Sequence, residues 1–325
     1  MIRYAGLDVH REVLVACIID SEGRCLERHR IELSRSSLER FARERLRRDD
    51  SVALEATPNT WAVVEVIEPY VERVVVANPL RTRAIAEAKV KTDKVDSEVL
   101  AQLLRCGYLA SVWRPDTPTR QLRELSAHRA ALVAEQTRLK NRIHSLLSQR
   151  LIRVPFAVLF SESGERWLRQ LPFDEGDRTV IDGHLRLLET IGQELAQVEK
   201  CLAQKSYPSE DVRLLMTLPG VGPACAQGLC AALGDWRPFR DGDHAASYIG
   251  LVPSTRQSAN ICRHGPITKA GNSLARWLLT QAAQHLATHP GPLGVFFRRI
   301  ARRKHRNVAV VATARKLVVI APFDA

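Results

Sequence analysis

The feature that most constrains the fold is a change of hydrophobic period along the chain. In the middle of the chain, apolar residues recur at spacings of three, four and seven, the period of an amphipathic helix. Two such runs occur, one made of Leu122, Leu125, Leu132, Leu139, Ile143 and Leu146, the other of Ile181, Leu185, Leu188, Ile191, Leu195, Val198 and Leu202. We predict two long helices that pack either against each other as a hairpin or against a partner chain as a dimerising coiled coil.

The first third of the chain has a different pattern, in which short apolar runs alternate with turn residues. Strands are predicted at 2–8, 13–19, 25–33, 51–55 and 71–77, and helices at 36–48 and 60–70. Three strands followed by helix, strand, helix and strand are typical of a mixed α/β sheet domain.

The 325 residues exceed one comfortable hydrophobic core, so several domains are expected. We predict an α/β domain over 1–112, a helical or coiled-coil region over 113–205 and a separate, mainly helical domain over 206–325. Uninterrupted apolar stretches of about 18 residues do not occur, which argues against a membrane span. The N-terminal apolar run is broken by charged residues and does not resemble a signal peptide.

Charge is spread unevenly over these three regions. The net charge is +12, and the first region is balanced, with 18 Lys and Arg against 18 Asp and Glu. The middle region carries 15 against 12, and the last region 15 against 6. A basic C-terminal third favours a polyanionic partner, most simply nucleic acid, over a merely solvated basic surface.

The cysteines argue against a stapled extracellular domain. There are 7 of them, an odd number, and they are scattered without any C-x-x-C pair. A zinc site or a disulfide framework is therefore not expected, and a reducing cytoplasm fits best.

Four acidic residues stand out in the first region. Asp8 and Glu55 end predicted strands, and Asp93 and Asp96 open a predicted helix that runs to Leu104. A spacing of three places the last two on one helical face. Taken singly, each acid has an ordinary explanation, as a turn residue, a helix N-terminal acid or half of a surface ion pair. Taken together, they can converge at one end of a sheet and bind Mg²⁺, a hard cation that prefers oxygen ligands and can polarise a phosphodiester.

A glycine-rich turn opens the last region. Leu-Pro-Gly-Val-Gly-Pro contains Gly220 and Gly222 and precedes a predicted helix at 224–233. Glycines at such a turn let backbone amides approach a DNA phosphate at the positive end of the helix, as in a helix–hairpin–helix-like element. A plain turn between two helices is the alternative.

Two further segments carry candidate phosphate contacts. A polar loop is predicted over 254–271, with several serine and threonine hydroxyls and the cations Arg256, Arg263 and Lys269, before a helix at 272–286. Nearby cations could hold a scissile phosphate, and a serine needs such help to act as a nucleophile, although a turn hydroxyl is the commoner role. Near the end, a dense basic run favours phosphate contact over a solvated helix face; it includes Arg302, Arg303, Lys304 and Arg306.

In order along the chain, these motifs resemble a known family. Gly-Leu-Asp-Val-His, a Glu after a short strand, Lys-x-Asp-x-x-Asp, Leu-Pro-Gly-Val-Gly-Pro, Gly-Leu-Val-Pro, Ile-Thr-Lys-Ala-Gly-Asn and Ala-Arg-Lys-Leu follow one another. The chain resembles the IS110-type (IS110/IS1111) DEDD transposases, recombinases of bacterial insertion sequences, over essentially its whole length.

The resemblance implies a RuvC-like, RNase H-like N-terminal domain. It also implies that Asp8, Glu55, Asp93 and Asp96 are the DEDD ligands of Mg²⁺ or Mn²⁺, and that a serine of the C-terminal transposase domain attacks DNA covalently. Similar proteins have Ser-Ser-Gly-Gly-Lys in the serine loop, and alignment from Pro253 places Ser258 on the second serine. Ser254 and Thr255 are the fallback candidates. Ala259, Asn260 and Ile261 depart from the family's glycines and lysine.

The resemblance further implies partners. Similar enzymes use a structured guide (bridge) RNA that pairs with DNA, and they work as homodimers or homotetramers in the bacterial cytoplasm, at the nucleoid. Two other functions stay open: a metal-only nuclease that hydrolyses branched DNA, and an inactive nucleic-acid-binding remnant of a transposase. The altered serine loop and the short C-terminus are the reasons to consider an inactive remnant.

Overall fold

The computed structural model describes residues 2–79, 81–82, 93–234, 239–258 and 261–321, without the side chains of 93–94, 256–258, 261 and 264. Two compact units divide the chain, Met1–Arg114 and Pro115–Ala325. Among the described residues, no helix combines the length and the apolar character that a membrane crossing requires.

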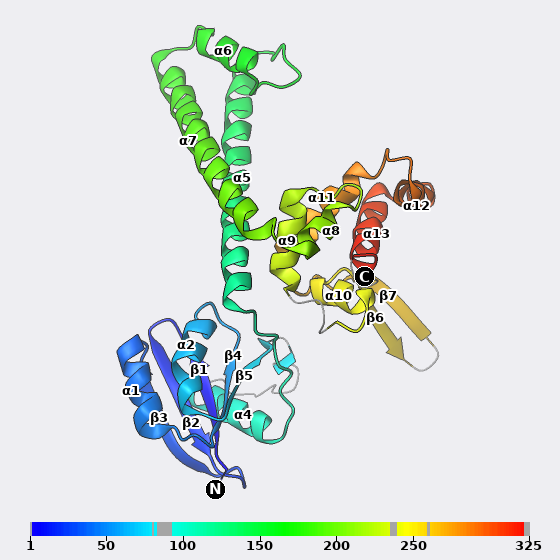
Figure 1. Cartoon of the computed structure of the whole chain (residues 1–325). Helices are drawn as coiled ribbons and strands as arrows, with labels where there is room; N and C mark the ends of the chain where they lie inside the picture. The colour runs from blue at the N-terminus through cyan, green and yellow to red at the C-terminus, as the bar shows by residue number, and fades with distance from the viewer. Residues whose placement is uncertain (1, 80, 83–92, 235–238, 259–260, 322–325) are drawn as a thin grey trace. The chain divides into compact units, whose positions relative to one another are not determined.

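A five-stranded mixed sheet forms the centre of the first unit (Figure 1). Its strands lie in the order β3-β2-β1-β4-β5, with bounds β1 Tyr4–Val9, β2 Val13–Ile19, β3 Cys25–Glu32, β4 Ser51–Glu55 and β5 Arg73–Ala77. The first three strands form an antiparallel meander, and β4 and β5 run parallel to β1. The mixed α/β prediction is confirmed, and the predicted strands at 13–19 and 51–55 match β2 and β4.

One face of this sheet is covered by α1 (Arg35–Arg45) and α2 (Thr60–Ile67). Alternate residues of each strand point to this face, since side chains in a strand have a period of two. They form one buried core with the helices, to which β1 contributes Ala5, Leu7 and Val9 and β4 contributes Val52 and Leu54. A short 3-10 helix, η1 (Glu68–Tyr70), follows α2, so the predicted helix at 60–70 is shorter than expected.

The opposite face is covered by α4 (Asp93–Arg105), which packs on β1, β2 and β4. The contact is close because β1 offers a glycine there: a Cβ on Gly6 would lie 2.0 Å from the carbonyl oxygen of Ser97 and 2.6 Å from the amide nitrogen of Ala101. Gly6 therefore sets how near α4 lies to the sheet.

A buried ion pair ties β1 to the turn before β4. Arg3 Nε donates to Asp50 Oδ1 at 2.8 Å and Arg3 Nη2 donates to Asp50 Oδ2 at 2.6 Å. The two side chains are 3% and 0% exposed. The hydrogen bond that Arg3 donates to Asp50 raises the pKa of Arg3.

The second unit begins with a long helical hairpin of α5 (Thr117–Gln149) and α7 (Glu175–Ser206), with α6 (Glu162–Gln170) across its far end (Figure 1). Asp116 and Asp174 cap the two long helices by accepting from the amides of Thr119 and Asp177. Between them lies a core that includes Leu139, Ile143, Leu147, Ile181 and Leu185. The hairpin alternative is thus what the single chain forms.

The rest of the unit is mainly helical, as predicted. It contains α8 (Glu210–Met216), α9 (Pro223–Leu233), α10 (Gly242–Ile249), α11 (Ser273–His285), α12 (Pro292–Ala301) and α13 (Arg306–Val319) around one apolar core. Arg123 of α5 donates to the carbonyls of Ala231 and Ala232 at 2.5 and 2.8 Å, which fastens the end of α9 to the long helix.

The prediction of a polar loop over 254–271 is wrong for the first part of that range. Residues there form two antiparallel strands, β6 (Pro253–Ser258) and β7 (Ile261–Ile267). The strands are polar and largely exposed, so they lack the apolar alternation from which a strand is recognised in sequence.

Candidate functional site: an acidic sheet edge and a basic surface

Asp8 and Glu55 end two neighbouring parallel strands. The register pairs Gly6 with Ala53 and Leu7 with Leu54, so Asp8 and Glu55 follow side by side. Adjacent strands lie about 4.8 Å apart. Because Leu7 and Leu54 face the α1–α2 core, alternation places both acids on the other face, which α4 covers.

Helix α4 brings its N-terminus to the same edge. Near its other end, Gln102 Nε2 donates to the carbonyl of Gly23 at 2.7 Å, in the turn that joins β2 to β3. That turn lies beside the start of β1, because Tyr4 pairs with Ile19. The helix therefore runs antiparallel to β1, and its first residues lie toward the end of β1 where Asp8 is found.

Asp96 lies on the same face of α4 as the residues that pack on the sheet. Ser97, Leu100, Ala101 and Leu104 form the buried stripe of the helix, and Asp96 lies one turn before Leu100 and is itself half-buried. Asp93 begins the helix, and its side chain lies outside the described residues. The structure thus brings Asp8, Glu55 and Asp96 to one edge of the sheet.

Asp8 has a histidine beside it. His10 Nε2 lies 3.1 Å from Asp8 Oδ2, and the carboxylate is 21% exposed. The carbonyl of His10 accepts from Asn59 Nδ2 at 3.3 Å, which links the turn after β1 to the loop after β4. This histidine is the last residue of the motif Gly-Leu-Asp-Val-His. It was not selected from the sequence, because only the four acids were considered as metal ligands.

The donor set fits a hard divalent cation, since it consists of carboxylate oxygens from three elements at one edge. Among the side chains that the structure describes, which do not include Asp93, no three His, Cys, Asp or Glu residues are arranged to hold a metal ion. Asp8, Glu55 and Asp96 are among these described side chains, so their position at one edge does not by itself make a metal site.

The candidate serine lies at the tip of the β6–β7 hairpin. Ser258 is the last residue of β6 and pairs with Ile261, and Arg256 pairs with Arg263. The side chains of Ser258 and Arg256 lie outside the described residues, whereas Arg263 is exposed. Lys269 follows β7, is exposed and has a left-handed backbone with φ 55°.

The two glycines of the Pro-Gly-x-Gly turn have different roles. Gly220 has φ 82°, and a Cβ there would lie 2.7 Å from the carbonyl oxygen of Ala282, so packing on α11 requires this glycine. Gly222 is the N-cap of α9 and has open space beside it, without a side-chain hydrogen bond to the cap among the described groups. Only Gly222 is placed to let a phosphate approach the helix N-terminus.

The basic run lies at the turn between α12 and α13. Arg302, Arg303, Lys304 and Arg306 are all exposed. Arg298, which belongs to the same run, is half-buried and donates to the carbonyls of Ala287 and His289 at 3.1 and 2.8 Å. Four cations are therefore available to a phosphate backbone, whereas Arg298 serves the fold.

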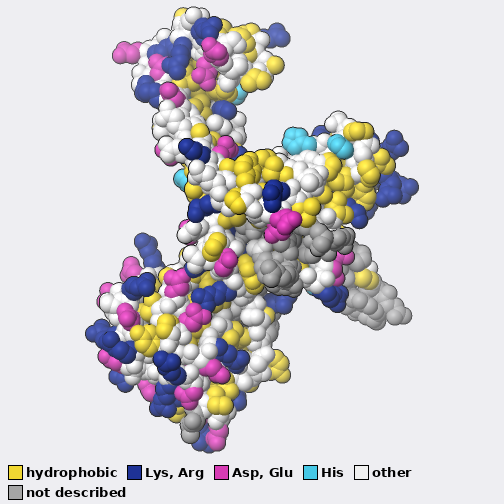
Figure 2. All heavy atoms as spheres, viewed as in Figure 1, with side chains coloured by type: hydrophobic (Ala, Val, Ile, Leu, Met, Phe, Trp, Pro, Cys, Tyr) yellow, Lys and Arg dark blue, Asp and Glu magenta, His cyan; other side chains and the backbone are white. Residues whose placement is uncertain are grey.

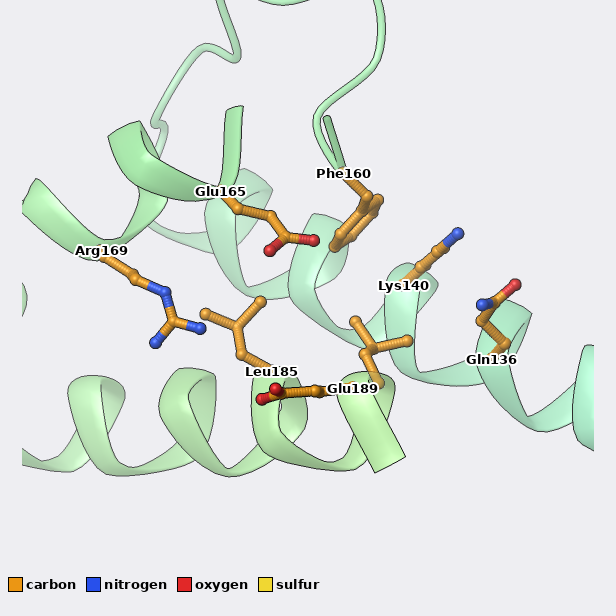
Figure 3. A pocket seen from close by; sticks show the side chains of 8 residues that line it. Gln136, Lys140, Phe160, Glu165, Arg169, Leu185 and Glu189 are labelled. Carbon is orange, nitrogen blue, oxygen red and sulfur yellow. The ribbon is translucent and has the colours of Figure 1, made fainter. Parts of the chain in front are cut away.

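One hollow at the far end of the helical hairpin had no signal in the sequence (Figure 3). It measures about 420 Å³, and its lining includes the cations Lys140 and Arg169 together with Glu165 and Glu189. Lys140 Nζ lies over the ring of Phe160, 5.3 Å from its centroid. Because acids and cations share this hollow, it offers no net charge to a polyanion.

Two family models match the chain, and both describe transposases. Residues 5–151 match the IS110 DEDD transposase model, and residues 212–295 match the model of the IS116/IS110/IS902 transposase family. Together they cover more than two thirds of the chain. The chain belongs to the IS110-type family of transposases.

Curated relatives agree with this membership. The transposase for insertion sequence element IS1111A of Coxiella burnetii is 25% identical over 70% of this chain and 64% of that protein. The transposase for insertion sequence element IS1328 of Yersinia enterocolitica is 24% identical over 83% of this chain and 82% of that protein. The pilin gene-inverting protein of Moraxella lacunata is 25% identical over 78% and 74%.

Some of these matches are partial. The matches to the putative transposase y4qE of Sinorhizobium fredii, the IS1111A transposase and a probable family 20 transposase of Pseudomonas aeruginosa cover 56%, 64% and 39% of the relative's own length, so the chain spans about half the length of these relatives.

Proposed function

We propose that this chain is a DNA transposase that cleaves and rejoins DNA to move an insertion sequence. The observation that carries the proposal is the sheet edge itself. Asp8 and Glu55 end adjacent parallel strands on one face, and α4 presents Asp96 at the same edge. Family membership supports the same reaction.

The N-terminal unit is proposed to have an RNase H-like (RuvC-like) fold. Three antiparallel strands followed by two strands parallel to the first, in the order β3-β2-β1-β4-β5, support this assignment. In such an arrangement the ends of β1 and β4 are neighbours, which gives a reason for acids at those two positions.

Asp8, Glu55, Asp93 and Asp96 are the proposed ligands of Mg²⁺ or Mn²⁺. The bound cation would supply charge stabilisation and polarise a phosphodiester oxygen. Without it, clustered carboxylates repel one another. The His10 ring nitrogen beside Asp8 Oδ2 fixes the orientation of that carboxylate.

Ser258 is the proposed nucleophile. In the step, its hydroxyl gives up a proton to a base, a bond forms between Oγ and the phosphorus, and the phosphorus–oxygen bond to the leaving sugar breaks. The leaving oxygen takes up a proton. Rejoining reverses the exchange with another strand's hydroxyl, so the number of phosphodiester links is kept. Nearby cations from β6, β7 and Lys269 would stabilise the phosphate charge.

Nucleic-acid contacts are proposed at three places. They are the α9 N-terminus with its Gly220–Gly222 turn, the hairpin cations Arg256, Arg263 and Lys269, and the exposed cations Arg302, Arg303, Lys304 and Arg306. A guide RNA, a homodimer or homotetramer, and action at the bacterial nucleoid are proposed from the family, and RNA that co-purifies with the full chain would test the first of these.

A covalent adduct tests the proposed chemistry. Labelled DNA that carries the element's ends is incubated with the full chain and Mg²⁺, and protein-bound label is read on a denaturing gel. We expect an adduct that is lost in Ser258→Ala and kept in Ser254→Ala. An undiminished adduct in Ser258→Ala would overturn the assignment of the nucleophile, and cleaved ends without attached protein would support hydrolysis by the acids alone.

A further inference from the structure

A second hollow lies on the C-terminal helices, where α11 gives way to α12. It measures about 550 Å³, and its lining comes from the turn before α12, from α12 and from α13: Pro290, Gly291, Pro292, Leu293, Val295, Phe296, Arg299 and Lys316. Figure 2 shows hydrophobic side chains gathered over α12, with Lys and Arg side chains beside them.

Part of the apolar lining is not used by the core. Phe297 is buried in the core of the unit, and Leu293 and Ile300 pack against that core. Val295 and Phe296 do not belong to that core; Val295 is 55% exposed and Phe296 is half-buried. An aromatic ring beside an open hollow offers a face on which a planar group can stack.

The charge around the ring has one sign. The Arg299 guanidinium carbon lies 5.4 Å from the centroid of the Phe296 ring, and Lys316 of α13 lines the same hollow. The four exposed cations of the α12–α13 turn follow α12 in the chain. From residue 286 to residue 323 the sequence contains neither Asp nor Glu. In the hollow at the far end of the helical hairpin, by contrast, Glu165 and Glu189 lie among the cations.

We propose that the hollow binds an unpaired base of single-stranded DNA, with Phe296 as the stacking platform and Arg299 and Lys316 on the adjacent phosphates. Base–aromatic stacking combined with cations along the backbone is how single strands are held without sequence preference. Duplex bases are already stacked and have no free face for the ring. The assignment to DNA rests on the proposed function, in which strands must separate at the point of cleavage.

Binding to labelled oligonucleotides tests the proposal. The full chain is titrated into a fluorescein-labelled oligo-dT of about 12 nucleotides, the scale of one single-strand binding site, and anisotropy is recorded. We expect Phe296→Ala to weaken binding on the order of ten-fold, and Phe296→Trp to keep it. A duplex of equal length should bind both variants like the unaltered chain.

Phe160→Ala is the matched control, because Phe160 also has a cation over its ring but lies in the hollow that contains acids. It should leave oligo-dT binding unchanged. Thermal unfolding of each variant shows that a loss of binding is not a loss of fold.

Three outcomes would overturn the proposal. Unchanged oligo-dT binding in Phe296→Ala removes the site, and an equal loss on duplex makes it an ordinary surface contact. A Phe296-dependent preference for oligo-U over oligo-dT assigns the hollow to RNA. The adduct experiment is independent of this one. If an adduct forms but binding does not depend on Phe296, only this inference is refuted. If binding depends on Phe296 but no adduct forms, only the proposed function is refuted.

Discussion

The two candidate surfaces of this chain are built in opposite ways. The acids at the sheet edge lie at the ends of β1 and β4, beside strand residues that are buried in the core. Helix α4 packs on these strands at a distance set by Gly6. The cations of the α12–α13 turn are exposed side chains where one helix ends and the next begins. The difference follows from the chemistry: a metal site needs several oxygens at fixed positions, whereas a phosphate backbone needs only charge within reach.

The same contrast holds for ion pairs. In the N-terminal unit Arg3 and Asp50 are almost fully buried and doubly hydrogen-bonded. In the helical hairpin Arg129 and Glu199 pair at 2.7 Å with side chains 22% and 51% exposed. The two pairs therefore allow the cost of losing a buried ion pair to be compared with the cost of losing an exposed one.

The largest effect is expected at the acidic edge. Asp8→Asn or Glu55→Gln keeps the size of the side chain but removes the charge that a divalent cation needs. Metal ions supply several kcal/mol of charge stabilisation, so DNA cleavage should fall at least about a thousand-fold. Chelation of the metal by EDTA should have a comparable effect on the unaltered chain.

Glu22→Gln is the control for this prediction. Glu22 is exposed and lies in the β2–β3 turn, at the opposite end of the sheet from Asp8. Its cleavage rate should match that of the unaltered chain. If Asp8→Asn cleaves at the same rate as Glu22→Gln, the acidic edge is not the catalytic site.

A smaller effect is expected for the buried ion pair. Asp50→Asn leaves the Arg3 guanidinium buried without its counter-charge, and breaking a buried pair costs about 3–5 kcal/mol. Urea unfolding monitored by circular dichroism measures the loss. Glu199→Gln, which breaks the exposed pair with Arg129, should cost about 0–1 kcal/mol, and equal losses in the two variants would contradict the contrast between the units.

The sequence predicted the strands of the sheet and placed Asp8 and Glu55 at strand ends, but it did not show which strands are neighbours. The strands at 13–19 and 51–55 were recognised because each is a short apolar run with turn residues at its ends. That Asp8 and Glu55 lie side by side depends on the parallel pairing of β1 with β4, a contact between residues 47 positions apart. Local pattern contains no information on which strands become neighbours.

The β6–β7 hairpin and the hollow on α12 were missed for different reasons. The hairpin strands contain few apolar residues, and these do not alternate with polar ones, so they give no period-two signal. Phe296 and Phe297 are adjacent in sequence and look alike there. Only the rotation of α12 decides that Phe297 enters the core and Phe296 faces the hollow.

Gly6 offers a test of how tightly α4 must lie on the sheet. In Gly6→Ala the new Cβ would meet backbone atoms of Ser97 and Ala101, which cannot move without displacing the helix. Overpacking of this kind costs about 1–3 kcal/mol, and cleavage should fall as well because Asp96 moves with α4. Gly192→Ala, with nothing near its Cβ in α7, should stabilise by about 0.5–1 kcal/mol. A Gly6→Ala protein as stable as Gly192→Ala would mean that α4 is free to shift.

The smallest effect is expected at a single exposed cation. Lys304→Gln removes one charge from the α12–α13 turn without changing a contact in the core, and each phosphate contact contributes about 0.9 to the slope of log affinity against log salt. The slope for a DNA duplex, measured by anisotropy over a series of salt concentrations, should fall by about 0.9. Arg298→Gln is the matched variant, since its guanidinium is occupied by the carbonyls of Ala287 and His289; it should lower the unfolding temperature and leave the slope unchanged. If Arg298→Gln lowers the slope as much as Lys304→Gln, the basic run binds DNA through the whole helix end, and the division between cations for the fold and cations for the phosphate backbone is wrong.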